Sequence, residues 1–85
     1  MNLETQKHST AVAILNWNGL RHLQDYLPSV VEHSESVAQI IVIDNGSTDD
    51  SVAWCRKTFP EVEIIELPEN LGFAGGYNAG LRQVR

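Results

Sequence analysis

The chain has 85 residues, with 6 Lys and Arg against 11 Asp and Glu, which gives a net charge of −5 at pH 7. This length suits one domain with a modest core, and the acidic balance argues against a nucleic-acid binder, which normally presents a basic face. The longest apolar run, Ala11–Leu15, is far shorter than the roughly 20 residues that cross a bilayer, so no transmembrane segment is expected. With one cysteine and no visible secretory signal, a cytoplasmic location is expected.

The first part of the chain predicts a strand followed by a helix. Residues 1–9 are polar and are expected to form a flexible leader. Residues 10–15 are apolar throughout, which is typical of a buried parallel strand. Pro28 lies inside the helical pattern that follows and should kink the helix or end it. That amphipathic helix is indicated by apolar residues at three- and four-residue spacings: Leu20, Leu23, Leu27, Val30 and Val31.

The second unit repeats this organisation. Residues 39–43 are, after Gln39, apolar and β-branched, and they predict a second buried strand. The turn that follows contains Ser47, and Asp50 stands three positions later, which matches a capping box. This pattern would place Asp49 and Asp50 in the first turn of a helix that Pro60 closes.

The third unit is a strand over residues 62–67, interrupted by Glu63 and Glu66, so we expect it near the edge of the sheet. A third helix is predicted from Ala74 onward, and its pattern is still unfinished at Arg85. The complete order is βαβαβα. The predicted fold is therefore α/β, with three layers and a parallel three-stranded sheet covered by helices.

Three polar or glycine-rich loops leave the carboxyl ends of these strands, over residues 16–19, 44–50 and 69–76. Ligands of open parallel sheets bind at that edge. Trp17 is either an aromatic that closes the core or a platform on which a nucleobase stacks. Asp44 is either the cap of an Asx turn or an acceptor for a base or a ribose, and the two roles are compatible.

The third loop carries the pattern G-x-x-G-G in Gly72, Gly75 and Gly76, flanked by Asn70 and Asn78. Glycine allows a positive φ and a close backbone approach, either for an unusual helix entry or for a loop that faces a phosphate or sugar. The pattern is neither the dinucleotide fingerprint nor the Walker motif.

The three loops together resemble family 2 nucleotide-sugar glycosyltransferases of the GT-A fold, closest to the rhamnosyltransferase-like branch. The segments that carry this resemblance are Ala11–Gly19, Ile41–Asp49 and Glu69–Asn78. The resemblance implies an inverting transferase that moves a sugar from a nucleoside diphosphate sugar to a glycan or lipid-linked acceptor. It extends over residues 10–85, as the nucleotide-binding portion of such a domain, truncated at its C-terminal end.

The resemblance also implies roles for individual residues. Trp17 would stack on the base and Asp44 would contact it, while Asn16 and Asn18 lie in the first nucleotide-contacting loop. The segment near the ribose and diphosphate would be formed by Asn70, Gly72, Gly75, Gly76 and Asn78. Ser47 and Thr48 would serve only to build the turn.

Family members also carry a D-x-D motif, which holds Mg²⁺ or Mn²⁺ on the diphosphate, and a later carboxylate that acts as general base. Neither is present in this sequence, so no catalytic or metal-binding residue is assigned and the chain alone is expected to be inactive. The complete enzyme would act in the cytoplasm or at the inner face of the membrane.

Three alternatives remain open at this point. A non-catalytic nucleotide-binding module would use the same sheet edge without a D-x-D motif. An oligomerising fragment would pair through its first strand, which lies inside the sheet in family members and would expose an apolar edge here. A flavodoxin-like protein would need a phosphate loop after the first strand, and Asn16–Gly19 supplies little of one.

Overall fold

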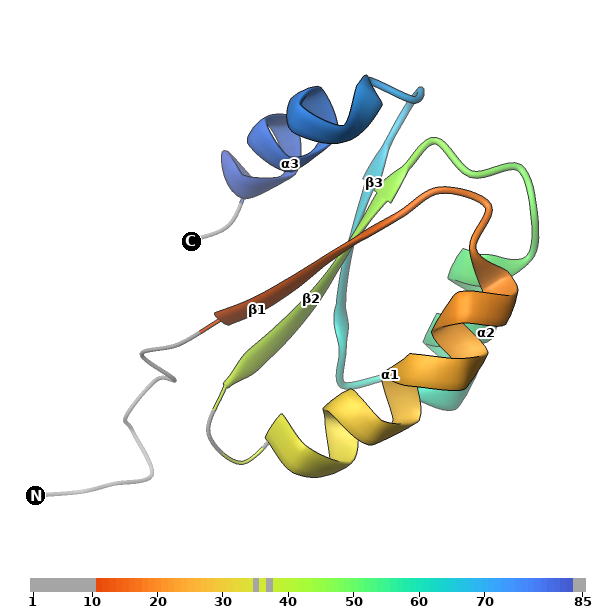
Figure 1. Cartoon of the computed structure of the whole chain (residues 1–85), viewed down its shortest axis with the longest axis vertical. Helices are drawn as coiled ribbons and strands as arrows, with labels where there is room; N and C mark the ends of the chain where they lie inside the picture. The colour runs from red at the N-terminus through yellow and green to blue at the C-terminus, as the bar shows by residue number, and fades with distance from the viewer. Residues whose placement is uncertain (1–10, 35, 37, 84–85) are drawn as a thin grey trace, which may run out of the picture.

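A computed structural model describes residues 11–34, 36 and 38–83. The predicted order of elements is confirmed (Figure 1). The elements are β1 (Ala11–Asn16), α1 (Leu20–Ser34), β2 (Gln39–Asn45), α2 (Ser51–Thr58), β3 (Glu63–Leu67) and α3 (Gly72–Leu81). The expected leader, residues 1–9, lies outside the described residues.

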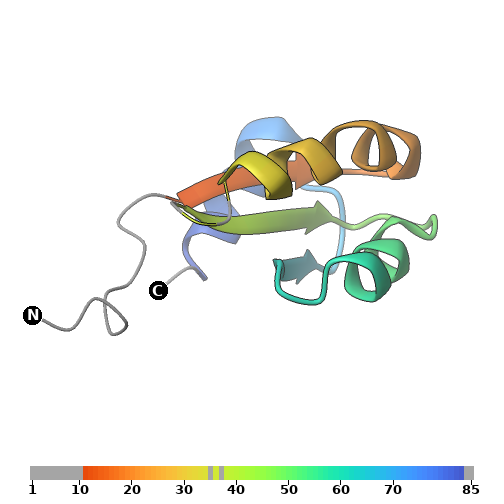
Figure 2. The ribbon, with the colours of Figure 1, turned by 90° about the horizontal axis from the view of Figure 1, so that it is seen from below.

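The strands form one parallel sheet in the order β1-β2-β3. Figure 2 shows them one beneath another in this order. In the register, Ala13 lies opposite Ile41, and Ile43 lies opposite Ile65. The prediction that the third strand lies at an edge is confirmed, and β1 forms the other edge of the described sheet.

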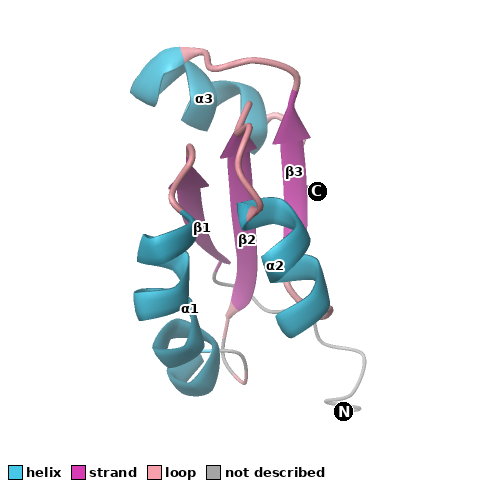
Figure 3. Ribbon diagram, turned by 90° about the vertical axis from the view of Figure 1, so that its right-hand side faces the viewer, coloured by secondary structure: helices cyan, strands magenta, loops and turns pink. Residues whose placement is uncertain are grey.

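Helices cover both faces of the sheet, so the molecule has the three predicted layers (Figures 1 and 3). One face packs against α1 and α2 through a cluster of buried side chains: Leu23, Leu27, Val31, Ile40, Val42, Cys55 and Val62. The other face packs against α3 through a second cluster: Ile41, Ile43, Ile65 and Leu67. Because strand side chains alternate between faces, β2 contributes to both clusters and is buried along nearly its whole length.

Pro28 does not end α1, which continues to Ser34. A proline removes one backbone donor and leaves the carbonyl four residues earlier without its partner. Here that carbonyl belongs to Gln24, and both Gln24 and Pro28 lie on the exposed face of the helix, where water can satisfy it. Leu27 and Val31 are buried on the opposite face, and their packing outweighs the local cost of proline.

The predicted capping box at Ser47 is wrong. Helix α2 begins at Ser51, with Asp50 as its N-cap and no acidic residue in its first turn. The Ser47 hydroxyl instead accepts hydrogen bonds from the Asn16 side chain at the end of β1 and from the Asn18 amide in the loop that follows. The Ser47 side chain, which the local pattern assigns to the helix N-terminus, is therefore used in a tertiary contact instead.

Helix α3 also differs in extent from its prediction. It begins at Gly72, two residues before Ala74, and ends at Leu81. Val84, on which the longer prediction depended, lies outside the described residues. Gly72, Gly75 and Gly76 of the predicted loop 69–76 therefore all lie within the helix.

Candidate functional site

The loops after β1, β2 and β3 leave the same edge of the sheet, where the carboxyl ends of the parallel strands meet (Figure 3). The predicted convergence of the loops at residues 16–19, 44–50 and 69–76 is therefore present, and in the structure the segments between the elements are 17–19, 46–50 and 68–71. Two of these loops are joined by a network of side-chain hydrogen bonds. The third is attached separately.

Asn16 is the centre of the network between the first two loops. Its side chain is buried, and its Nδ2 donates to Asp44 Oδ1 at 2.9 Å and to Ser51 Oγ at 2.9 Å. The Ser47 hydroxyl lies 3.2 Å from the same nitrogen. One amide therefore connects the end of β1 to the end of β2, to the following turn and to the start of α2.

Asp44 is the second-to-last residue of β2, directly after the apolar residues of this strand, and it is only 3% exposed. A buried carboxylate is costly unless it is paired or hydrogen-bonded. Here Oδ1 accepts from Asn16, and Oδ2 accepts from the Ser47 backbone amide at 3.0 Å. The Asx-turn interpretation is thus correct, and the carboxylate keeps further lone pairs that a ligand at the edge could use.

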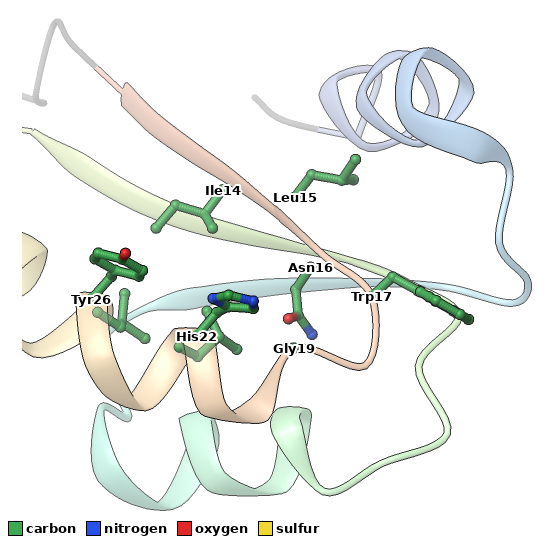
Figure 4. Close-up of a pocket in the computed structure, with 9 residues that line it drawn as sticks. Ile14, Leu15, Asn16, Trp17, Gly19, His22 and Tyr26 are labelled. Carbon is green, nitrogen blue, oxygen red and sulfur yellow. The ribbon is translucent and has the colours of Figure 1, made fainter.

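Trp17 stands between two anchored asparagines. Asn18 has a φ of 48°, in the left-handed region that asparagine tolerates. Its Oδ1 accepts from the amides of Thr48 at 2.7 Å and Asp49 at 3.2 Å. Trp17 belongs to neither core cluster and is 54% exposed, and Figure 4 shows its side chain directed away from Asn16. The core-closing alternative is therefore wrong, and an aromatic face is held open at the sheet edge.

Asp49 completes the link between these loops. Its Oδ1 accepts from the backbone amide and hydroxyl of Ser51, and its Oδ2 accepts from the Leu20 amide at 3.2 Å. Desolvation by itself would raise the pKa of the Asp49 carboxyl, but these hydrogen bonds outweigh it and hold the pKa below its ordinary value. The ionised carboxylate thus fastens the starts of α1 and α2 to one loop.

The third loop is fixed by Asn45, which is 2% exposed. Asn45 Oδ1 accepts from the Leu71 amide at 2.9 Å, and its Nδ2 donates to the Gly72 carbonyl at 3.0 Å. The same Nδ2 lies 3.2 Å from Asn70 Oδ1, which also accepts from the Gly72 amide at 2.7 Å. Asn70 is therefore held in place between β2 and the start of α3.

The glycines of this loop differ from one another. Gly72 has a φ of +78°, as the pattern suggested, and the space beside its Cα is open. Gly75 and Gly76 are helical, so the expectation of positive φ fails there, although Gly76 does allow a close approach to Asn45. Asn78 lies exposed on α3, and in the described residues no hydrogen bond joins its side chain to the other loops.

Sequence reasoning missed Asn45 and Ser51. Both are buried polar residues, and each satisfies a partner from another segment. The available signal was a polar residue directly after Asp44 in an otherwise apolar strand, and a serine after two acidic residues. Such residues are costly to bury unless they are hydrogen-bonded.

A pocket of about 220 Å³ lies beside the outer edge of β1, on the α1 side (Figure 4). Its lining is mostly apolar and comes from β1, the following loop and α1, including Ile14, Leu23 and Leu27. His22 and Tyr26 stack with ring centroids 6.4 Å apart at its rim. Asn16, Trp17 and Gly19 also line the pocket, so it adjoins the loop after β1 that belongs to the candidate site.

The described residues contain no group of three His, Cys, Asp or Glu side chains that could hold a metal ion. The carboxylates at the edge, Asp44 and Asp49, are engaged in the hydrogen bonds above. In the same part of the chain, no helix combines the length and apolar character needed to traverse a bilayer.

Comparison with known proteins gives one consistent result. The family described as Glycosyl transferase family 2 matches residues 11–85. An uncharacterised glycosyltransferase of Nostoc sp. is 32% identical over 73 residues, covering 82% of this chain and 23% of the relative. A low-salt glycan biosynthesis hexosyltransferase of Haloferax volcanii is 24% identical, covering 93% of this chain and 24% of the relative.

An N-acetylglucosaminyl-diphospho-decaprenol L-rhamnosyltransferase of Mycobacterium tuberculosis is 29% identical over 63 residues, covering 74% of this chain and 20% of the relative. The chain thus spans about a quarter or less of the length of these curated relatives. No solved structure matches it significantly. The family match extends over nearly all the described elements and all three loops of the sheet edge, and the chain belongs to glycosyl transferase family 2.

Proposed function

We propose that the carboxyl edge of the sheet binds the nucleotide of a nucleoside diphosphate sugar. In this proposal the chain supplies the donor-binding portion of an inverting transferase whose acceptor is a glycan or a lipid-linked sugar. The family match supports glycosyl transfer. Two of the relatives described above bear names that specify a hexosyl and a rhamnosyl transfer, the second to a diphospho-decaprenol acceptor.

The observation that carries the proposal is the exposure of Trp17 at the carboxyl end of the strands, between two hydrogen-bonded asparagines. Asn16, which precedes Trp17, is the partner of Asp44 in the register of β1 and β2. A large aromatic face left in water is a suitable platform for a base, and stacking contributes about 1–3 kcal/mol per base. Asp44 would accept from the base or ribose, and Asn70 with the glycines of the third loop would lie near the sugar and diphosphate.

Transfer with inversion needs an acceptor hydroxyl to attack the anomeric carbon opposite the departing nucleoside diphosphate. This step requires a base and charge neutralisation on the diphosphate. The carboxylates of Asp44 and Asp49 are already engaged in holding loops. We therefore expect the 85-residue chain to bind nucleotide without turnover, and any use of Mg²⁺ or Mn²⁺ would depend on other residues. A cytoplasmic location, or one at the inner face of the membrane, remains part of the proposal.

The test is calorimetric titration of the chain with UDP and with dTDP. Trp17→Ala should weaken binding by at least about tenfold, the equivalent of 1.4 kcal/mol of lost stacking. Tyr26→Ala is the matched control, because it removes an exposed aromatic from α1. Equal affinities for wild type and Trp17→Ala would remove Trp17 from the site. Sugar release from a donor in the presence of Mn²⁺ and acceptor would contradict inactivity, whereas equal affinity for nucleotides with and without a sugar would favour a non-catalytic module.

A second proposal concerns self-association through β1. In the described sheet, the outer edge of β1 has no strand partner, and the strand Ala11–Asn16 carries no charge. The opposite edge strand, β3, carries Glu63 and Glu66, which deter strand addition. A two-fold antiparallel pairing of β1 with a second copy would bring no like charges of this strand together.

Light scattering at tens of micromolar, a range that detects moderate association, tests this pairing. Wild type should be a dimer or larger, and Ala11→Lys should shift it toward monomer, because a lysine on an edge strand opposes pairing. Arg21→Lys, on the exposed side of α1, should leave the assembly unchanged. A clean monomer for wild type would overturn the proposal.

A further inference from the structure

Asn45 holds the third loop by a set of contacts that only an asparagine can make in this orientation. Its Nδ2 faces two acceptors, Asn70 Oδ1 and the Gly72 carbonyl, while its Oδ1 faces one donor, the Leu71 amide. An aspartate is the same size but offers only acceptors when ionised. At 2% exposure, such a mismatch could not be relieved by water.

Two glycines make room for this attachment. A Cβ on Gly76 would lie 2.7 Å from Asn45 Nδ2, so α3 approaches the amide as closely as its backbone allows. Gly46 has a φ of +79°, and a Cβ there would lie 2.5 Å from the backbone carbon of Glu69. The end of β2 and the start of the third loop are therefore fitted to each other on both sides of Asn45.

The attachment is separate from the network at Asp44. Asn16 and Asn18 bind the loops after β1 and β2, whereas Asn45 is the one buried polar residue in the described part of the chain whose side chain bonds to the segment 70–72. That segment contains Asn70 and Gly72, for which a nucleotide-contacting role is proposed. Asn45 therefore contributes hydrogen bonds that hold this segment relative to Trp17 and Asp44, in addition to the close approach of the backbones at Gly46 and Gly76.

We infer that Asn45 is a positioning residue, which sets the third loop for the sugar-diphosphate end of the nucleotide without contacting the ligand itself. The inference rests on the proposed nucleotide site. If it holds, weakening the amide contacts will reduce nucleotide affinity by displacing residues 70–72, and restoring a donor at position 45 will restore the affinity.

In the Asn45→Asp variant, the donor at position 45 can be removed and restored by changing the pH. Its carboxylate would face two acceptors, which raises its pKa, and protonation at lower pH returns one donor. Asp44, which precedes position 45, and Glu69, which lies beside Gly46, are the same in wild type and variant. We therefore expect the variant to bind UDP or dTDP about 2- to 10-fold more weakly than wild type at pH 8, corresponding to one net hydrogen bond, with the ratio approaching one at pH 5. Taking the ratio at each pH cancels titration of the ligand.

Amide hydrogen exchange of Leu71 and Gly72, followed by NMR, reports on the loop without nucleotide. Both amides should exchange faster in Asn45→Asp at pH 8, relative to the intrinsic rate, and regain protection at pH 5. Asn45→Ala loses the contacts without acquiring a titratable group, so its faster exchange and weaker binding, relative to wild type, should not vary with pH. Asn45→Ala also tests the inference if Asn45→Asp does not fold. Gln24→Glu, an exposed amide-to-acid change on α1, should match wild type in both measurements.

Unchanged protection of Leu71 and Gly72 in both Asn45 variants would overturn the inference. Faster exchange with unchanged nucleotide affinity would overturn it as well, because the loop would then move without consequence for binding. If wild type binds neither nucleotide, the proposed function fails and the positioning role fails with it, while the exchange data still show whether Asn45 holds the loop.

Discussion

The Nδ2 atom of Asn16 lies 2.9 Å from Oδ1 of Asp44, and the two residues are direct partners in the parallel register of β1 and β2. Both side chains are buried. The same amide also donates to Ser51, so it satisfies a carboxylate and a helix start at once. At this end of the strands, the neutral Asn16 side chain therefore stabilises the buried Asp44 carboxylate.

This relationship predicts that Asn16→Ala destabilises the fold by about 1–3 kcal/mol, the cost of leaving a buried polar group without its partner. The measurement is urea unfolding followed by circular dichroism at pH 7. Gln24→Ala removes an exposed amide from α1 and should change the free energy of unfolding by less than about 0.5 kcal/mol. A loss for Asn16→Ala no larger than that of the control would mean that water replaces the amide at Asp44.

Asn16→Asp gives a second measure of the same contact. It would place two carboxylates in hydrogen-bonding distance at a buried position, where like charges cannot both ionise easily. We expect this variant to be less stable than Asn16→Ala at pH 7 and to recover as the pH falls, because one of the pair then takes up a proton. Stability that does not vary with pH would show that the two side chains have separated.

The elements and their order could be predicted because they follow from periodicity. Apolar strands and the three- and four-residue spacings of the helices depend only on neighbouring residues, and they also imply a parallel sheet with its loops at one edge. The continuation of α1 through Pro28 was not predictable in this way. It depends on the burial of Leu27 and Val31 against the sheet, a tertiary effect that outweighs local preference.

The partners within the site were harder to predict for a similar reason. Asn16 and Ser51 are 35 residues apart, and their contact exists only once the strands are in register. The short pattern at Ser47 suggested a helix cap, whereas in the folded chain the Ser47 hydroxyl accepts a hydrogen bond from the Asn18 amide. Asn45 stood beside Asp44 in the sequence, yet its partners lie in a loop about 26 residues further on.

Gly80 and Gly75 should respond oppositely to alanine, although both lie in α3. A Cβ on Gly80 would lie 2.5 Å from Ile43, which is fully buried, so Gly80→Ala must displace the core and should cost about 1–3 kcal/mol. A Cβ on Gly75 would meet only the Leu71 side chain, at 3.2 Å. Since alanine favours helix, Gly75→Ala should be neutral or more stable by up to about 1 kcal/mol.

Thermal unfolding of both variants beside wild type measures this difference. If only Gly80→Ala melts at a lower temperature than wild type, the close approach of α3 to β2 explains the glycine at position 80. Equal losses in both variants would indicate that the helix backbone itself, rather than the contact with Ile43, requires glycine.

Cys55 should react very slowly with thiol reagents in the folded protein. It is fully buried, and burial, together with the charge of Asp44, raises the pKa of its thiol to about 11. At pH 8 the thiolate fraction is then about 200-fold below that of an ordinary cysteine with a pKa near 8.5. Labelling with a disulfide reagent should be at least that much slower than in urea-unfolded chain.

The raised pKa also sets the direction of a pH effect. The folded chain holds the thiol protonated, while the unfolded chain releases the proton above about pH 8.5. Stability should therefore decline as the pH rises from 8.5 toward 11, and Cys55→Ser should show less of this decline. Rapid labelling of the native protein at pH 8 would contradict the burial of the thiol.

Asp49 should make the fold sensitive to acid. Its hydrogen bonds favour the ionised carboxylate and lower its pKa in the folded state. The unfolded chain therefore takes up the proton first, so the stabilising contribution is complete above about pH 4 and is lost as the pH falls through the lowered folded pKa.

Asp49→Asn isolates this contribution. The amide would turn a donor toward the amide of Leu20 or of Ser51, each of which needs an acceptor, so the variant should unfold at lower urea than wild type at pH 6. The difference between their urea midpoints should shrink as the pH is lowered from 4 to 2, because wild type then loses its own carboxylate. Asp25→Asn removes the same charge from the exposed face of α1 and controls for net charge. A constant difference between Asp49→Asn and wild type across this range would show that the ionisation of Asp49 does not support the loops.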